Sequence, residues 1–211
     1  MKLITQNGYV INISINNRKM GSIPSFSLPP IKTCSPSACK QCGKKCYAQR
    51  HMYGLHKTVK NAWDENLNAV ENDLQGVEQA LNGYFNTLTA PRFFRVHVGG
   101  DFVNKAYFEM WVRIAATHPN TNFLAFTKYF DNVTAEKLPD NFSLVCSSWA
   151  GVEIPEKLNS LPVAHCRQKG ESVSPDLLPC NGNCDTCGVC WSLGKIIKEQ
   201  NTYKGVYFDE H

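Results

Sequence analysis

The fold is decided by the stretch Pro91-Arg-Phe-Phe-Arg-Val-His-Val-Gly-Gly-Asp101. Its β-branched and aromatic residues over 92–98 predict a strand, and the Gly-Gly-Asp sequence at 99–101 predicts the turn that ends it. Asn104 is then a helix cap, and apolar residues recur at helical spacing until His118-Pro119, where the helix stops. A strand followed directly by a helix is the building unit of a parallel α/β sheet.

The same alternation continues toward the C-terminus. The sequence predicts strands over 122–127, 142–146 and 161–165, with a short helix over 134–138 between the first two of them. Strands and helices that alternate with short connections form right-handed βαβ units. We therefore expect an α/β fold with a parallel sheet, built as one domain over residues 1–211.

The segments on either side complete this picture. Residues 2–5 and 9–15 alternate apolar and polar residues around Asn7-Gly8, which predicts a hairpin, and residues 18–33 are expected to be irregular. Helical spacing over 59–88 predicts one or two amphipathic helices with a break near Asn72-Asp73. The expected parts are a lead-in at 1–33, a first cysteine segment at 34–50, a β/α core at 51–166, a loop at 168–179 and a second cysteine segment at 180–190.

Eight of the ten cysteines fall into two groups of four. No apolar run is long enough for a membrane span, and no signal-peptide core follows the first methionine, so we expect a cytoplasmic protein that makes no membrane contact. In that reducing compartment cysteine clusters indicate metal rather than disulfides. The first quartet is Cys34, Cys39, Cys42 and Cys46, and the second quartet is Cys180, Cys184, Cys187 and Cys190.

The spacing of the second quartet favours an iron–sulfur cluster. Its gaps of three, two and two residues are similar to the compact cysteine runs that wrap a [4Fe-4S] cube. A structural zinc ion usually takes two ligands from one knuckle and two from a distant segment. Zinc is the alternative, and disulfides or thiols without a role are the third interpretation. We expect the two quartets at opposite ends of the scaffold.

Charge is distributed unevenly along the chain. Residues 1–63 contain ten basic and no acidic residues, whereas residues 64–211 contain twelve basic and eighteen acidic ones, which gives +10 and −6 within the overall +4. The favoured interpretation is that cations near the first quartet offset the charge of ligated thiolates. The alternative, nucleic-acid binding, lacks an aromatic-stacking pattern. The cations concerned are Lys40, Lys44, Lys45 and Arg50.

Ligand-binding residues are expected where the parallel strands end, because loops there vary freely while helix N-termini point inward. His97 alternates with Arg95 and Gly99, so the three are expected on one face of their strand. Cys146 and Cys166 are more simply interpreted as small buried apolar residues than as redox groups. The candidate binding residues are His97, Gly99, Gly100, Asp101 and Lys128.

Several motifs together carry a family resemblance. Residues 94–102, the Trp111 helix, Phe126-Thr-Lys128, Cys46-Tyr-Ala48 and the run from Cys184 to Trp191 resemble a cysteine-rich family encoded largely by bacteriophages and prophages. The resemblance spans roughly residues 30–195, and its motifs occur in the same order. If the protein is phage-encoded, its cytoplasm is that of the host cell.

More distantly, the layout is similar to the radical S-adenosylmethionine superfamily. That resemblance implies a partial (β/α) barrel, a [4Fe-4S] cluster on the first quartet, S-adenosylmethionine as a cofactor contacted by Gly99, Gly100 and Asp101, and an auxiliary cluster on the second quartet. Two features differ from the superfamily pattern. The first quartet has gaps of four, two and three residues, and Asp101 stands where a glutamate is usual.

Three functions follow as hypotheses. The first is an iron–sulfur protein for electron transfer or reductive radical chemistry, with an electron donor or acceptor protein as its partner. The second is a non-catalytic zinc or iron–sulfur module whose basic N-terminal third binds nucleic acid or a host protein. The third is storage or delivery of iron–sulfur units.

Overall fold

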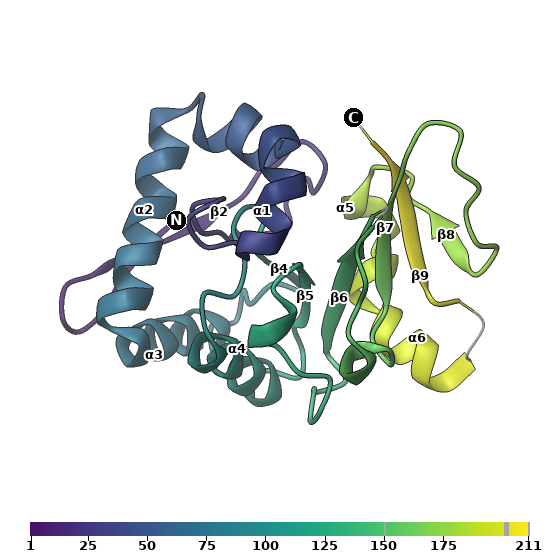
Figure 1. The fold of residues 1–211 in the computed structure, drawn as a ribbon. Helices are drawn as coiled ribbons and strands as arrows, with labels where there is room; N and C mark the ends of the chain where they lie inside the picture. The colour runs from purple at the N-terminus through teal and green to yellow at the C-terminus, as the bar shows by residue number, and fades with distance from the viewer. Residues whose placement is uncertain (150, 201–202, 211) are drawn as a thin grey trace.

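The computed structural model describes residues 1–149, 151–200 and 203–210, with the side chains of Gln41, Lys44, His51 and Gln200 outside the description. The described strands form one sheet in the order β1-β2-β3-β4-β5-β6-β7-β9-β8 (Figure 1). Pairing is antiparallel from β1 to β3 and parallel from β3 to β8. The strands are β1 (Lys2–Ile4), β2 (Val10–Ser14), β3 (Ser25–Phe26), β4 (Phe93–Val96), β5 (Asn122–Thr127), β6 (Phe142–Ser148), β7 (Val163–Arg167), β8 (Leu177–Pro179) and β9 (Gly205–Asp209).

The helices alternate with these strands along the chain, so the fold is mixed α/β with a mostly parallel sheet, as the alternating sequence pattern predicts. They are α1 (Pro36–Cys42), α2 (Lys57–Asn72), α3 (Leu74–Phe85), α4 (Lys105–Thr117), α5 (Cys184–Cys187) and α6 (Leu193–Gln200). Short 3₁₀ turns are η1 (Gly43–Lys45), η3 (Phe130–Asn132), η4 (Glu156–Leu158) and η5 (Val189–Trp191), and η2 (Ala48–Tyr53) is a π-helix. No helix among the described residues is long and apolar enough to cross a membrane.

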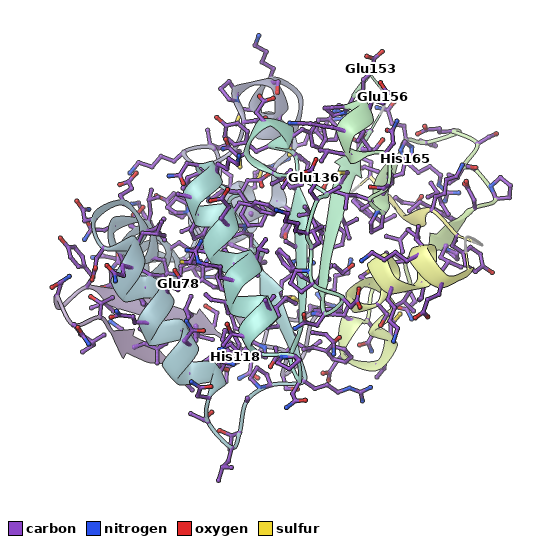
Figure 2. All side chains as sticks on the ribbon, turned by 90° about the horizontal axis from the view of Figure 1, so that it is seen from below. Glu78, His118, Glu136, Glu153, Glu156 and His165 are labelled. Carbon is purple, nitrogen blue, oxygen red and sulfur yellow. The ribbon has the colours of Figure 1, made fainter. Side chains whose placement is uncertain are left out.

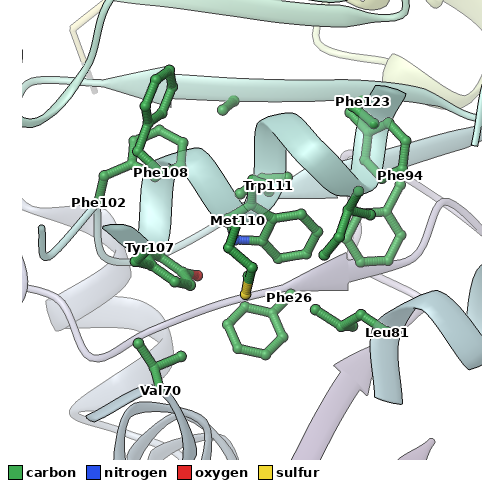
Figure 3. Close-up of a cluster of buried hydrophobic side chains, with 14 of the residues drawn as sticks. Phe26, Val70, Leu81, Phe94, Phe102, Tyr107, Phe108, Met110, Trp111 and Phe123 are labelled. Carbon is green, nitrogen blue, oxygen red and sulfur yellow. The ribbon is translucent and has the colours of Figure 1, made fainter. Parts of the chain in front are cut away.

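Each face of the sheet carries its own apolar core. On one face, helices α2, α3 and α4 cover alternate residues of the central strands, including Leu144. Phe94 and Phe123 belong to the same set (Figure 3). The fully buried Trp111 of α4 lies at the centre of this first core, with its ring centroid 5.7 Å from that of Phe94. In the same strands, the residues next in sequence to these point to the other face of the sheet. There they form a second core that contains Leu124, Val145, Ala164, Trp191 and Leu193.

Strand order explains why the C-terminal helix lies on the second face. From β3 to β7 each new strand is added on the same side of the previous one, so right-handed crossovers place the connecting helices on one face. The chain then passes from β8 back to β9, which lies between β7 and β8. A right-handed crossover in this reversed direction puts its helices on the opposite face. Segment 180–200 therefore covers the second core rather than the first.

Several local predictions are confirmed. β1 pairs with β2 in antiparallel register around Asn7-Gly8, and the positive φ of 84° at Gly8 suits a tight turn. α2 ends at Asn72, and the Asp73 carboxylate accepts a hydrogen bond from the Gly76 amide at 3.1 Å to begin α3. Asn104 caps α4 by accepting from the Tyr107 amide at 2.9 Å. These signals are local, so the sequence carries them in full.

Other predictions were wrong or incomplete. Residues 134–138 form no helix: the Thr134 hydroxyl accepts from the Glu136 amide, Lys137 has a positive φ of 58°, and Pro139 follows. The segment expected to be irregular contains β3, and the loop expected at 168–179 contains β8. The predictions also lacked β9 and α6. The expectation of a single domain over 1–211 stays a prediction.

Candidate metal centre

The first quartet lies over the carboxyl ends of the strands. Ser35 begins α1, since its hydroxyl oxygen accepts from the Ala38 amide at 3.1 Å, and the same hydroxyl donates to the Lys128 carbonyl oxygen just after β5 at 3.2 Å. Tyr47, beyond the last cysteine, donates from its hydroxyl to the Val98 carbonyl oxygen after β4 at 2.6 Å. Lys45 pairs with Glu210, beyond β9. These contacts hold the segment across the edge where ligands of parallel sheets bind.

The four thiols of the first quartet interact with one another. The Cys42 thiol donates a hydrogen bond to Cys46, and this bond, with the backbone amides of Ala48 and Gln49, lowers the pKa of Cys46 to about 6. The same bond raises the pKa of Cys42 above its ordinary range. Burial, the Asp101 charge and the neighbouring thiols raise the pKa of Cys34 to about 12. The hydrogen bond therefore shifts the two pKa values apart, with that of Cys46 lowered and that of Cys42 raised.

The charge of Lys128 acts on two thiols of the first quartet. Its charge lowers the pKa of both Cys42 and Cys46. Its ammonium nitrogen lies 5.6 Å from the ring centroid of Trp149. The sequence predicts Lys128 as a binding residue, and the groups on which its charge acts include Cys42, Cys46 and Asp101. Two other lysines are expected to offset the charge of ligated thiolates. The Lys44 side chain lies outside the described residues, and Lys45 is paired with Glu210.

Atoms of the protein itself occupy the space around the Gly-Gly-Asp motif. A Cβ atom at Gly99 would lie 2.4 Å from the Trp63 ring. Gly100 has a φ of 81°, and a Cβ there would lie 2.7 Å from Leu28 and Thr33. Asp101 is 3% exposed. Its carboxylate accepts from the Thr127 hydroxyl and from the Lys128 and Phe102 amides, at 2.7 to 2.8 Å. Cofactor contacts from these residues stay a prediction.

His97 does not share a face with Arg95, contrary to the sequence expectation. β4 ends at Val96, and His97 has a φ of 66°, which interrupts the alternation of a strand. Its ring turns to the first core, where Nε2 lies 2.8 Å from the Tyr107 hydroxyl oxygen and Nδ1 has no partner among the described residues. Burial, and secondarily the Arg95 charge, lower the pKa of His97 to about 3.

This burial predicts a pH dependence of stability. Between pH 6.5 and about 3 the unfolded chain binds a proton at His97 and the native chain does not, so stability falls as the pH falls, by about 1.4 kcal/mol per unit. His97→Asn, which tolerates a positive φ, should be less stable at pH 7 and lose less stability on acidification. Urea denaturation of both proteins at pH 7.5, 6.5, 5.5 and 4.5 measures this. The prediction would be contradicted if the free energy of unfolding of the two proteins fell equally with pH, or if the imidazole resonance of His97 titrated near pH 6.

The second quartet lies on the other face of the sheet but at the same edge. Cys184 and Cys190 pack against the second core, while Cys187 is exposed. The Cys184 amide donates to the Lys19 carbonyl oxygen at 2.9 Å, and the Cys180 amide donates to that of Tyr207 at 2.8 Å. Burial raises the pKa of Cys190 to about 12, and the other three thiols of the quartet act in the same direction. Figure 1 shows α1 and α5 toward the same end of the sheet, so the expectation of opposite ends was wrong.

Arg95 is a site residue that the sequence reasoning missed. Its guanidinium lies on the second face, with Cζ 4.1 Å from the ring centroid of Phe126, and its Nε donates to the His97 carbonyl oxygen at 2.9 Å. Burial raises the pKa of both Cys184 and Cys190; Lys19 and then Arg95 oppose this at Cys184, and Arg95 opposes it at Cys190. Its position in the sequence could have indicated this role, because Arg95 is a charged residue within a predicted strand of otherwise mostly apolar residues.

The remaining polar group lies at the ends of β6 and β7. His165 Nδ1 is 3.3 Å from the Ser148 hydroxyl oxygen, and its Nε2 is 2.9 Å from a Glu171 carboxylate oxygen. Figure 2 shows His165 on the opposite side of the molecule from His118. Cys166, next in sequence, is half-buried; burial and the Glu210 charge raise its pKa, and Lys128 opposes them. Cys146 is fully buried in the first core, as expected of a small apolar residue.

Among the described residues, no three His, Cys, Asp or Glu side chains are arranged to hold a metal ion. The assignment of the eight cysteines as ligands of a metal or cluster stays a prediction. Within each quartet, the thiols influence one another and a neighbouring cation.

Comparisons with known proteins give a family match and a bacteriophage relative. The family described as GP88, Gene product 88, matches residues 2–160. The "Gene 88 protein" of Mycobacterium phage L5 is 28% identical over 121 residues, which cover 53% of this chain and 50% of that protein, so the chain spans about half the length of this relative. No solved structure matches. The expected resemblance to a phage-encoded family is confirmed, and the matched residues end before the second quartet.

Proposed function

The chain belongs to the Gene product 88 family, and from this premise we propose that its two cysteine quartets each ligate a [4Fe-4S] cluster for electron transfer or reductive chemistry. One observation carries the proposal. The charge of Lys128 acts on Cys42 and Cys46 of the first quartet, and in the second quartet Lys19 and Arg95 act on Cys184 and Arg95 acts on Cys190. A set of thiolates that binds a metal needs such compensation, because uncompensated charge is costly away from water.

The donor atoms and their surroundings fit such a group. Thiolates are the protein ligands of iron–sulfur clusters, and hydrogen bonds to sulfur help to set their potential. The amides of Ala48 and Gln49 already supply such bonds to Cys46. The spacing of residues 180–190 supports a cluster over a single zinc ion. When bound, a cluster of this kind takes up and releases single electrons.

The scaffold supports a distant relation to partial (β/α) barrels. Strands β3 to β7 are parallel and follow one another in sequence order, as strands of such a barrel do. We do not extend the proposal to S-adenosylmethionine. Asp101 already accepts three hydrogen bonds, and both glycines are packed against protein atoms, so a ligand's ammonium group would have to displace these contacts.

Metal analysis of matched variants tests the proposal. We expect protein purified without oxygen to be brown and to contain about eight iron and eight sulfide per chain. We expect each of two double variants to lose about half of the iron and half of the sulfide: Cys39→Ala/Cys42→Ala in the first quartet and Cys184→Ala/Cys187→Ala in the second. Cys166→Ala, which removes a half-buried cysteine outside both quartets, should keep them all.

Other results would decide against it. A colourless protein with stoichiometric zinc, or iron that no cysteine variant reduces, would refute the iron–sulfur assignment. Rapid cluster loss to an apo-acceptor protein would favour iron–sulfur delivery over electron transfer.

A further inference from the structure

We propose that Ser148, His165 and Glu171 form a second site that hydrolyses carboxylic esters, with Ser148 as the nucleophile and His165 as its general base. A chain of hydrogen bonds joins the three side chains. His165 Nδ1 lies 3.3 Å from the Ser148 hydroxyl oxygen, and His165 Nε2 lies 2.9 Å from a Glu171 carboxylate oxygen. A hydroxyl, an imidazole and a carboxylate in contact in this order activate the hydroxyl for acyl transfer.

Strand pairing brings the hydroxyl and the imidazole together. β6 and β7 are parallel neighbours, and their register sets Ser148 directly opposite His165. Ser148 is the last residue of β6, so the pair lies at the carboxyl ends of the strands, where parallel sheets bind their ligands. Both residues are half-buried. A substrate can therefore reach the pair from solvent, while water weakens its hydrogen bonds less than it would on an open surface.

Glu171 orients the imidazole. One of its carboxylate oxygens accepts from His165, and the other accepts from the Gln168 amide at 2.8 Å, so the loop after β7 holds the carboxylate in place. The Gln168 amide, and secondarily His165, lower the pKa of Glu171, and an ionised carboxylate only accepts hydrogen bonds. In the neutral ring, Nε2 therefore carries the proton, and Nδ1 presents a lone pair to the Ser148 hydroxyl. This is the tautomer that a general base requires.

Lys128 brings a positive charge to the same edge of the sheet. It follows β5, the neighbour of β6, and its ammonium nitrogen lies 5.6 Å from the ring centroid of Trp149, the residue after Ser148. Attack on a carbonyl group places negative charge on the carbonyl oxygen, which a nearby cation stabilises. The substrate class is an ester rather than an amide, because an alcohol leaves more readily than an amine.

The reaction balances with water as its only co-reactant. The Ser148 oxygen bonds to the carbonyl carbon while its proton passes to His165 Nδ1, and that proton leaves with the alcohol when the ester bond breaks. Water then adds to the acyl group and gives a proton to Nδ1, which returns it to the Ser148 oxygen as the acid departs. The 3.3 Å contact is long for proton transfer, and such contacts often shorten when a substrate binds.

Labelling with a fluorophosphonate, which reacts with activated serine hydroxyls, tests the nucleophile. We expect mass spectrometry to find the label on Ser148. His165→Gln, which can keep both hydrogen bonds but supplies no base, should slow labelling by about a hundredfold or more. Ser147→Ala is the matched control and should label normally, because Ser147 pairs with Ala164, a residue of the second core on the opposite face. No label on Ser148, an undiminished rate in His165→Gln, or an equal loss in Ser147→Ala overturns the proposal.

Hydrolysis of p-nitrophenyl acetate tests Glu171 as a positioning residue. Ser148→Ala should abolish the hydrolysis. Glu171→Gln should lower kcat and leave KM nearly unchanged, since the carboxylate acts on the base and not on the substrate. Glu171→Asp keeps a carboxylate and should restore part of the loss. An unchanged kcat in Glu171→Gln, or a loss that Glu171→Asp does not reduce, overturns the role of Glu171. Neither measurement depends on iron content, so failure here leaves the proposed function intact.

Discussion

Asp101→Ala is expected to lower the free energy of unfolding by about 3 to 5 kcal/mol, because it removes the acceptor of three hydrogen bonds in the interior. The carboxylate joins the end of β4 to the end of β5 through Thr127 and the Lys128 amide. Without it, two backbone amides at this edge lose their side-chain acceptor, at a cost of about 1 to 3 kcal/mol each where they are buried.

Two further variants separate charge from shape. Asp101→Asn keeps the shape but replaces one acceptor with a donor that faces another donor, so we expect about half the loss. Thr127→Val removes one donor and should cost about 1 kcal/mol. Urea denaturation followed by circular dichroism measures all three. If Asp101→Ala keeps its stability within about 1 kcal/mol and instead loses a bound ligand, Asp101 acts as a ligand contact and not as a structural cross-link.

Trp191→Ala is expected to cost about 3 to 5 kcal/mol and to release the second quartet from the sheet. Trp191 is 1% exposed and lies at the centre of the second core. Its indole nitrogen donates to the Phe94 carbonyl oxygen at 3.0 Å, and its ring centroid lies 5.3 Å from that of Phe93. It immediately follows Cys190, so its packing fixes where this thiol lies relative to Arg95.

Trp191→Phe is the matched control. The phenyl ring keeps much of the apolar contact and loses the hydrogen bond, so we expect a cost of about 1 to 2 kcal/mol. Denaturation together with iron analysis distinguishes the two effects: Trp191→Ala should lose iron from the second quartet and retain that of the first. Equal loss from both quartets would mean that Trp191 supports the whole sheet rather than one segment.

Sequence reasoning succeeded where the structural signal is local. The break between α2 and α3 at Asp73, the cap of α4 at Asn104 and the bounds of β5 follow from caps and periodicities that span a few residues. It failed at β3, which is only two residues long and owes its place to parallel pairing with β4, seventy residues later. It also failed at His97, where a positive φ reverses the face that alternation predicts.

The sequence by itself determined the α/β class, the hairpin and helices of the first part of the chain, and the eight cysteines that make a metal centre worth testing. Only the tertiary structure decided that both quartets lie at one edge of the sheet, where Tyr47 and Arg95 donate to the Val98 and His97 carbonyl oxygens just after β4. The physical reason is that these placements depend on strand order. The return from β8 to β9 turns the last segment onto the second face, and Trp191 then packs against β4, almost one hundred residues earlier in the chain.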